Sequence, residues 1–261
     1  MSTTSHFAAG SFCWVDLATT DPRAATAFYT DIFGWAAYDV PTDQGVPYTM
    51  LTKGGRKVAA LFQLSADMGT HPFWQSYVAV NDVNASSARA NALGGRILMP
   101  PMDVMKAGRM AVVRDPGGAA FALWQPREHG GADLVNAVGA ACWHELQSLD
   151  ADDAQRFYAG LFGWTLRISE SLPGETYRLF HNGARDCAGL MPLAAVWGPV
   201  PPNWAIYFGV SDCDATIAAA QAGGGKLLSA VMDIERVGRF VTLQDPQGAA
   251  FSIIQFTSEH D

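Results

Sequence analysis

The sequence predicts an α+β fold of four strand–helix–strand–strand–strand (βαβββ) modules, paired into two similar domains. One observation behind this prediction is an internal duplication with a period of about 130 residues. A second is that each half contains two Asp-capped helix patterns, each following a strand-like segment. A third is an Asp-Pro-x-Gly turn before the last strand-like segment of each half.

The duplication is visible in short motifs that recur at a nearly constant offset along the chain. The clearest pairs of segments are 13–17 (CWVDL) with 142–146 (CWHEL), 33–35 with 162–164, and 115–121 with 245–251. A polar, Gly-rich stretch separates the copies, as expected of a domain boundary. We therefore expect domains at residues 8–127 and 137–258, joined by a linker at 128–136.

The first module shows why these elements are expected. Phe12–Leu17 alternates with the period of a strand, Asp21 caps the following helix with Pro22 at its first position, and Gly34 ends it. The helix carries an apolar stripe at Ala25, Phe28, Tyr29 and Ile32. The second copy repeats it, with Asp150 as the cap, Gly163 as the stop, and Ala154, Phe157, Tyr158 and Leu161 as the stripe.

The other elements follow from alternation and turn residues. Asp82 and Asp212 cap the second helix of each copy, which closes at Gly94 or at the glycines 223–225. In the first copy the remaining strands are expected at 36–40, 48–53, 58–64, 74–80, 96–99, 109–114 and 119–125.

The amino-acid composition excludes several classes of protein and of partner. Nearly half of the 261 residues are hydrophobic (49%) and 16% are charged, which favours a well-filled core. The net charge of −8, without a basic run, argues against nucleic acid as a partner. Apolar runs are strand-length, which predicts no membrane span, and the start of the chain does not resemble a signal peptide, so we expect a cytoplasmic protein. Reduced, buried thiols are expected at Cys13, Cys142, Cys187 and Cys213.

The Asp-capped helix running into Phe-Tyr and Phe-Gly-Trp, with the Asp-Pro-x-Gly turn, resembles the vicinal oxygen chelate superfamily. This superfamily includes glyoxalase I, extradiol dioxygenases and bleomycin-resistance proteins. Residues 101–104 and 108–113 are most similar to its fused two-domain actinobacterial group, whose members are labelled "hydroxylase" or antigen. The resemblance implies two glyoxalase-like domains with curled mixed sheets, each with a concave face that encloses a small-molecule ligand.

Metal-dependent members of that superfamily hold a metal with His and Glu at fixed distances from the Asp motifs. In this chain those positions are Trp14, Gln75, Ala122, Trp143, Ala205 and Ser252. Of these only Gln75 offers a ligand, and one amide does not hold a metal. We therefore predict no metal and no other cofactor.

Asp16 and Glu145 are the candidate catalytic residues. They are repeat equivalents in the middle of apolar strands, on the same strand face as Trp14 and Trp143. A carboxylate in an aromatic cavity can serve as a general acid or base. The alternative that each only accepts structural hydrogen bonds stays open.

Further residues are candidates for binding the ligand. Arg109 and Arg239 could grip an anion or pair with the two carboxylates, although strand-end arginines are also often solvated. Tryptophan can stack a flat ligand and methionine can adapt to it, but both also fill cores. The candidates of this kind are Trp14, Trp143, Trp74, Trp204, Gln75 and Met102, whereas Trp35 and Trp164 are expected to be core.

Three functions remain open. The leading hypothesis is a metal-independent protein, acting as a monomer or homodimer, that sequesters or transforms an apolar or aromatic metabolite by acid–base chemistry. The second is a metal-dependent lyase, isomerase or dioxygenase with unusual ligands. The third is a non-catalytic structural or interaction protein whose clefts are filled by its own side chains.

Overall fold

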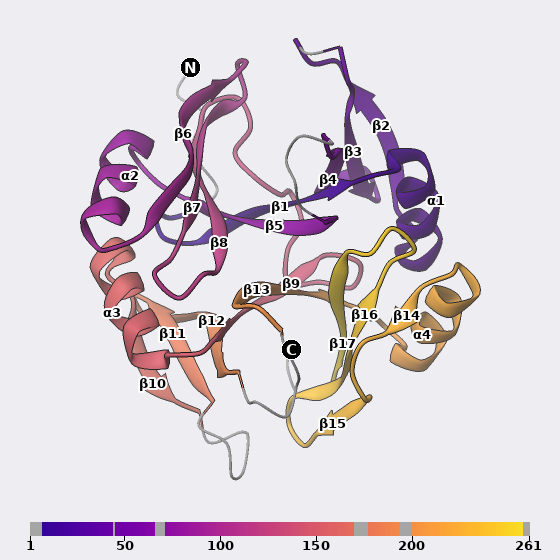
Figure 1. Cartoon of the computed structure of the whole chain (residues 1–261). Helices are drawn as coiled ribbons and strands as arrows, with labels where there is room; N and C mark the ends of the chain where they lie inside the picture. Colours follow the sequence, from indigo (N-terminus) through magenta and orange to yellow (C-terminus); the bar gives the residue numbers. More distant parts are fainter. Residues whose placement is uncertain (1–6, 44, 66–70, 170–176, 194–199, 258–261) are drawn as a thin grey trace. The chain divides into compact units, whose positions relative to one another are not determined.

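A computed structural model describes residues 7–43, 45–65, 71–169, 177–193 and 200–257. The described residues form four helices and seventeen strands in two mixed sheets, without a closed barrel (Figure 1). This confirms the predicted α+β class. The predicted end of the second domain, residue 258, lies outside the described residues.

The first repeat gives two βαβββ modules in chain order. Its elements are β1 (Phe12–Thr19), α1 (Pro22–Phe33), β2 (Ala36–Val40), β3 (Tyr48–Lys53), β4 (Arg56–Gln63), β5 (Phe73–Ala79), α2 (Val83–Ala92), β6 (Arg96–Val104), β7 (Gly108–Arg114) and β8 (Ala120–Pro126). They form one sheet in the order β2-β3-β4-β1-β5-β8-β7-β6.

The second repeat has the same plan. Its elements are β9 (Ala141–Ser148), α3 (Ala151–Phe162), β10 (Thr165–Ile168), β11 (Arg178–Asn182), β12 (Arg185–Pro192), β13 (Asn203–Gly209), α4 (Cys213–Ala222), β14 (Lys226–Leu227), β15 (Met232–Ile234), β16 (Gly238–Gln244) and β17 (Ala250–Phe256). The sheet order is β10-β11-β12-β9-β13-β17-β16-β14, and β15 pairs with β16.

Strand β6 differs from its prediction, because it continues past Met99 to Val104. The prediction stopped before Pro100 and Pro101, which cannot donate backbone hydrogen bonds. The structure accommodates both prolines because β6 is the last strand of its sheet and its register with β7 shifts between Ile97 and Met102.

Local capping explains the helix boundaries. Asp21, Asp82, Asp150 and Asp212 all accept hydrogen bonds from backbone N–H groups of the first helical turn, as predicted. Gly34 and Gly163 end α1 and α3 with φ of 62° and 74°, a conformation that costs glycine little. None of the helices in the described ranges is long and apolar enough to cross a membrane.

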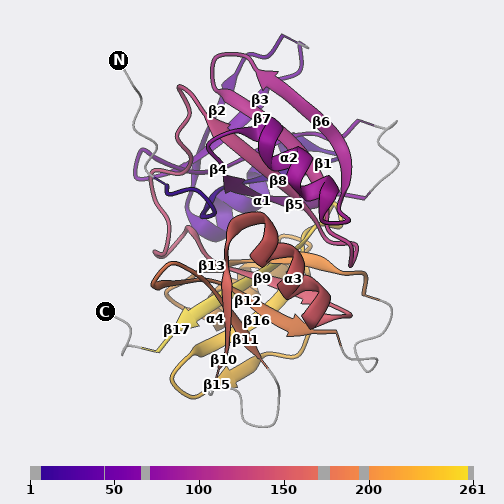
Figure 2. The ribbon, with the colours of Figure 1, turned by 90° about the vertical axis from the view of Figure 1, so that its left-hand side faces the viewer.

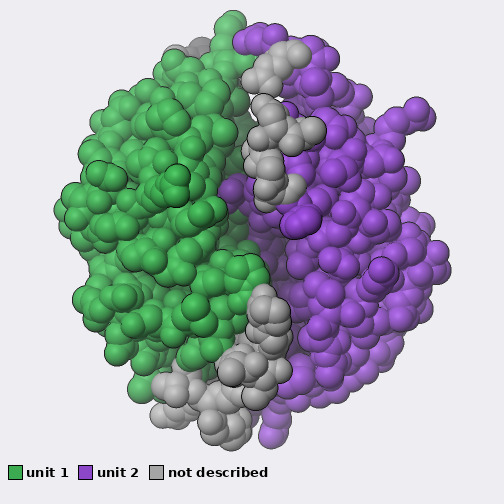
Figure 3. Space-filling view, viewed as in Figure 1, with its two compact units in different colours: residues 1–14, 76–131, 144–205 green, residues 15–75, 132–143, 206–261 purple. Residues whose placement is uncertain are grey.

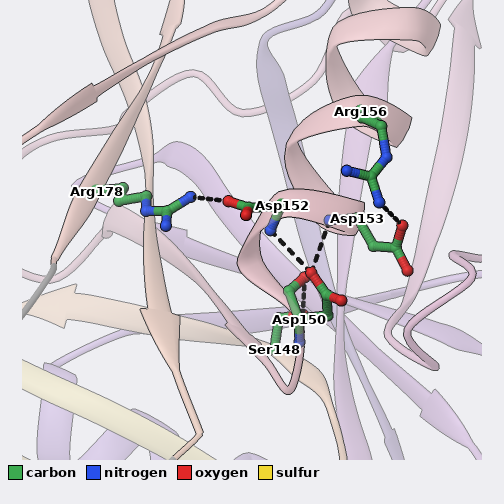
Figure 4. A network of polar contacts seen from close by, with 6 residues as sticks. All are labelled: Ser148, Asp150, Asp152, Asp153, Arg156 and Arg178. Atoms are coloured by element: carbon green, nitrogen blue, oxygen red, sulfur yellow. Dashed lines mark hydrogen bonds and ion pairs between the residues drawn. The ribbon is translucent and has the colours of Figure 1, made fainter.

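The start of α3 shows such a cap within a larger polar network (Figure 4). Asp150 Oδ1 accepts from the backbone N–H groups of Asp152 and Asp153 at 3.0 and 2.9 Å. Arg178 of β11 pairs with the Asp152 carboxylate at 2.6 Å and holds the pKa of Asp152 below its usual value. The network therefore ties the first turn of α3 to a strand of its own module.

Two compact units are distinguished by their internal contacts (Figure 3). Unit 1 comprises residues 1–14, 76–131 and 144–205. In its core, α2 and α3 lie next to each other, and α3 packs on β10 and β12 (Figures 1 and 2). The largest buried side chains of this core include Phe121, Tyr158 and Trp164.

Unit 2 comprises residues 15–75, 132–143 and 206–261. Here α1 lies beside α4, and α1 packs on β2 and β4 (Figure 1). The predicted stripe of α1 is buried at Ala25, Phe28 and Tyr29, while Ile32 is partly buried at the edge of the same core. Trp35 and Trp164 both lie in the cores, as predicted.

The four cysteines are free thiols, as expected. Cys13 and Cys213 are buried, whereas Cys142 and Cys187 are partly exposed, so the expected burial holds for two of them. Burial raises the pKa of Cys142 and Cys187 to about 12, which makes these thiols poor nucleophiles at neutral pH.

Candidate functional site

Asp16 is a buried carboxylate on the face of β1 that is turned away from the helices. Its neighbours Val15 and Leu17 lie in the core of unit 2, and strand alternation therefore directs Asp16 to the opposite face. Asp16 is only 2% exposed to solvent. The hydroxyl of Tyr48 donates to Asp16 Oδ2 at 2.9 Å.

Aromatic and apolar side chains surround this carboxylate–phenol pair on the same sheet face. In the strand register Asp16 lies opposite Ala60, which lies opposite Met50, and Tyr48 lies opposite Phe62. The rings of Tyr48 and Phe62 are stacked, with centroids 6.4 Å apart and planes 21° apart. We call this surface the Asp16 face; it consists of Asp16, Ala18, Tyr48, Met50, Ala60 and Phe62.

The Asp16–Tyr48 pair has a defined chemistry. A carboxylate accepts and a phenol both donates and accepts, so together they can bind a ligand hydroxyl or carbonyl and relay one proton. Sequence analysis missed Tyr48. A signal was available, because Tyr48 recurs as Tyr177 at the same offset at which Asp16 recurs as Glu145.

Gln75 is buried in β5, next to Trp74. Because Trp74 lies in the core of unit 2, alternation turns Phe73 and Gln75 toward the other face of the strand.

Trp14 belongs to an aromatic cluster in unit 1. Its ring meets that of His129 edge-on at 4.5 Å, and the indole N–H of Trp124 donates to the His129 carbonyl at 3.0 Å. Tyr77 lies edge-on to Trp124 at 6.2 Å. His129 lies in the segment predicted to be a linker and has no equivalent in the other repeat, so sequence analysis set it aside as a site residue. Met102, in β6, is 41% exposed and lies opposite Met110.

Glu145, the equivalent of Asp16, has a different environment in unit 1. Leu146 lies in the core, so Glu145 and Gln147 occupy the opposite face of β9. Gln147 Nε2 donates to Glu145 Oε1 at 3.4 Å, and Asn203 Nδ2 donates to Gln147 Oε1 at 3.1 Å. Gln147 occupies the position of Ala18 in the Asp16 face. Trp143, at the start of β9, is partly exposed.

Trp74 and Trp204 lie in the cores and donate to buried tyrosines, which favours a structural role over ligand stacking. The Trp74 indole N–H donates to the Tyr29 hydroxyl at 3.0 Å, which in turn donates to Asp245 Oδ2 at 2.9 Å. Asp245 Oδ1 accepts from three backbone N–H groups of its own Asp-Pro-x-Gly turn.

The same network recurs in unit 1. Trp204 donates to the Tyr158 hydroxyl at 2.8 Å, which donates to Asp115 Oδ2 at 2.9 Å. Burial raises the pKa of Tyr29 and Tyr158 well above its usual value, so both remain protonated donors. Each network joins a helix of one repeat to a turn of the other.

Arg109 and Arg239 pair with carboxylates other than the two candidates. Arg109 Nε lies 3.1 Å from Asp103 Oδ1 in the neighbouring strand β6. Arg239 pairs with Asp214 at 2.9 Å and also with Asp233. These partly exposed pairs favour the alternative of strand-end arginines over that of an anion site.

The superfamily's metal positions carry a donor set that does not fit a divalent metal. Ala122 and Ala205 have no donor atoms, and Trp14 and Trp143 offer only an N–H. Gln75 offers a single amide oxygen, and the Ser252 hydroxyl lies 2.9 Å from the Thr242 hydroxyl. Among the described residues no three His, Cys, Asp or Glu side chains form a cluster that could hold a metal.

His144 follows the alternation and points away from its neighbour Glu145. Its ring stacks on Phe12 with centroids 3.9 Å apart, and its Nδ1 lies 3.1 Å from the Ser76 hydroxyl. Burial lowers the pKa of His144 to about 3, so the ring is neutral at physiological pH.

This buried histidine predicts a pH dependence of stability. In the unfolded chain His144 binds a proton below pH of about 6.5, whereas the folded protein does not until about pH 3. The free energy of unfolding should therefore fall by about 1.4 kcal/mol per pH unit below about pH 6. Urea unfolding of His144→Asn at several pH values should show a correspondingly shallower slope; parallel slopes would contradict the assignment.

The chain belongs to the Glyoxalase/Bleomycin resistance protein/Dioxygenase superfamily, which matches residues 6–123, with a second Glyoxalase-like domain at residues 144–254. It is 42% identical over 257 residues to CFP32 of Mycobacterium tuberculosis, a protein named as a glyoxylase (96% of this chain, 97% of the relative). It is 36% identical over 264 residues to the anthracycline biosynthesis protein DnrV of Streptomyces peucetius (96% and 95%).

Solved structures show the same fold at low sequence identity. The 2,3-dioxygenase LapB of Pseudomonas sp. KL28 aligns with a TM-score of 0.63 at 13% identity, over 95% of this chain and 93% of that one. The Mn(II)-bound glyoxalase from Novosphingobium aromaticivorans aligns with a TM-score of 0.58 at 15% identity, over 95% and 84%. The predicted superfamily resemblance is confirmed.

Proposed function

We propose that the protein binds a flat aromatic metabolite on the Asp16 face and exchanges a proton with a hydroxyl or carbonyl group of that ligand. The observation that carries this proposal is the hydrogen bond of 2.9 Å between the buried Asp16 carboxylate and the partly buried Tyr48 phenol, among apolar side chains. A low-dielectric surrounding strengthens such polar contacts and fixes the ligand's orientation.

An aromatic ligand is supported by the other members of the face. Phe62, stacked with Tyr48, offers a ring surface, and Met50 offers an adaptable apolar one. The relative DnrV is named for anthracycline biosynthesis, and anthracyclines contain fused aromatic rings bearing phenol and quinone groups. Such a ligand would present oxygen atoms to Asp16 and Tyr48 while its rings cover the apolar side chains.

The proposed function uses no metal at the superfamily's usual ligand positions. It is supported by the donor chemistry of those positions, since alanine and tryptophan side chains do not bind divalent metals. Location in the cytoplasm and the monomeric or homodimeric state stay predictions.

The proposal is tested with 1,4-dihydroxyanthraquinone as the probe and tryptophan fluorescence quenching as the measurement. Asp16→Asn should weaken binding about 10- to 100-fold, because a hydrogen bond to a charged group contributes about 1.5–3 kcal/mol. Tyr48→Phe should weaken binding less, and prior treatment with EDTA should leave the affinity unchanged.

Asp103→Asn is the matched control, because Asp103 is an exposed carboxylate that pairs with Arg109 and Arg127. It should bind the probe as wild type does. Equal affinities of wild type and Asp16→Asn would overturn the assignment of Asp16, and a dependence on metal would overturn the proposal of metal-free binding.

A further inference from the structure

The faces around Asp16 and Glu145 differ at three pairs of equivalent positions. Ala18 of the first repeat corresponds to Gln147 of the second, and Phe62 corresponds to Met191, both at the offset that relates Asp16 to Glu145. Phe73 at the start of β5 corresponds to Asn203 at the start of β13. The second repeat therefore has two amides where the first has a methyl group and an aromatic ring.

The two amides form a directed chain of hydrogen bonds that ends on Glu145. Asn203 uses both N–H groups, one toward the Pro201 carbonyl at 2.9 Å and one toward Gln147 Oε1 at 3.1 Å. Gln147 passes one N–H on to Glu145 at 3.4 Å. Asn203 is left with its Oδ1 acceptor, and Gln147 with a second N–H donor.

A second pair of positions has changed in the same direction. Val112 and Ala122 of the first repeat correspond to Thr242 and Ser252, which lie opposite each other in β16 and β17. Their hydroxyls are 2.9 Å apart and bond to each other. This hydroxyl pair lies in unit 2, which also contains Asp16, so it does not contribute to the face around Glu145 in unit 1.

We infer that Gln147 and Asn203 are specificity-determining residues that make the face around Glu145 a second binding site, selective for a polyhydroxylated ligand. Each hydroxyl of a polyhydroxylated ligand can both donate and accept a hydrogen bond. Neighbouring hydroxyls can therefore bond to the Glu145 carboxylate, the Asn203 amide oxygen and the Gln147 N–H. A flat aromatic ring would cover these groups without satisfying them, so that face rejects it. The contrast with the Asp16 face depends on the proposed function.

Native mass spectrometry with 1,4-dihydroxyanthraquinone tests the discrimination. Wild type should bind one molecule per chain, and the Asp16→Asn variant should bind it more weakly. The double variant Gln147→Ala/Asn203→Phe should bind two molecules. Gln147→Ala alone, which removes the middle of the amide chain, should gain a weaker second molecule and serves if the double variant does not fold. Two molecules on wild type, or one on both variants, would overturn the inference.

Saturation-transfer NMR with myo-inositol, D-glucose and D-ribose tests the polyhydroxylated ligand separately. At least one of them should receive saturation from wild type and from Asp16→Asn, and lose it with Gln147→Ala/Asn203→Phe. No transfer from wild type, or equal transfer from the double variant, would overturn the inference. Wild type that binds a polyol but no anthraquinone would overturn the proposed function alone.

Discussion

Replacing Asp245 with alanine is expected to lower the free energy of unfolding by about 3–5 kcal/mol, because several donors lose their acceptor together. The Asp245 carboxylate accepts from the Tyr29 hydroxyl and from backbone N–H groups including those of Gly248 and Ala249. Removing it leaves these buried donors without an acceptor, and each such donor costs about 1–3 kcal/mol. Urea unfolding followed by tryptophan fluorescence measures the loss.

Tyr29→Phe isolates one link of this network. It removes the hydroxyl between Trp74 and Asp245 and should cost less than Asp245→Ala. The control is Asp103→Ala, whose exposed ion pairs should contribute less than about 1 kcal/mol. If Asp245→Ala were no more costly than Asp103→Ala, the buried network would not stabilise the fold as inferred.

Gly238→Ala is expected to destabilise the protein by about 3 kcal/mol or more, because strain and overpacking act together. Gly238 has a φ of 146°, and a Cβ there would lie 2.3 Å from the Gln255 carbonyl oxygen of β17. At the equivalent Gly108 a Cβ would lie 2.6 Å from the Gln125 carbonyl oxygen. The duplicated Gly-Arg motif is thus explained by the close approach of two strands.

The Gly183→Ala variant separates the cost of backbone strain from the cost of steric overlap with the added Cβ. Gly183 has a φ of 65°, but a Cβ there would meet nothing within 4 Å. It should therefore cost only about 1 kcal/mol, the usual cost of a left-handed conformation. Thermal unfolding of both variants measures the difference in stability. Equal losses of stability would contradict the prediction, because they would show that the strands move apart to accommodate a Cβ at Gly238.

The candidate site was predictable only in part. The position of Asp16 in the middle of an apolar strand indicated a buried carboxylate, and the structure gives Asp16 an exposed fraction of 2%. Its phenol partner Tyr48 is 32 residues away in the chain, and spacing alone did not indicate the pairing. The partners of Arg109 and Arg239 depended likewise on which strands became neighbours.

The tryptophans show the same limit. Their duplication was visible, but composition does not distinguish a ring that fills the core from one that faces a ligand. Trp74 and Trp14 are both almost fully buried, yet one donates to Tyr29 in a core and the other meets His129. Strand register and the path of the segment around His129 decided between the two.

By itself, the sequence determined the duplication, the four capped helices and most strand positions. These features depend on interactions within a few residues: a carboxylate reaches the N–H groups of the next turn, and alternation sorts neighbouring side chains between two faces. Only the tertiary structure decided that Tyr29 meets Asp245, 216 residues away, that Tyr48 meets Asp16, and that Asn203 reaches the Gln147 amide. Such contacts depend on which strands and helices pack together, and that arrangement minimises the free energy of the whole chain rather than of any segment.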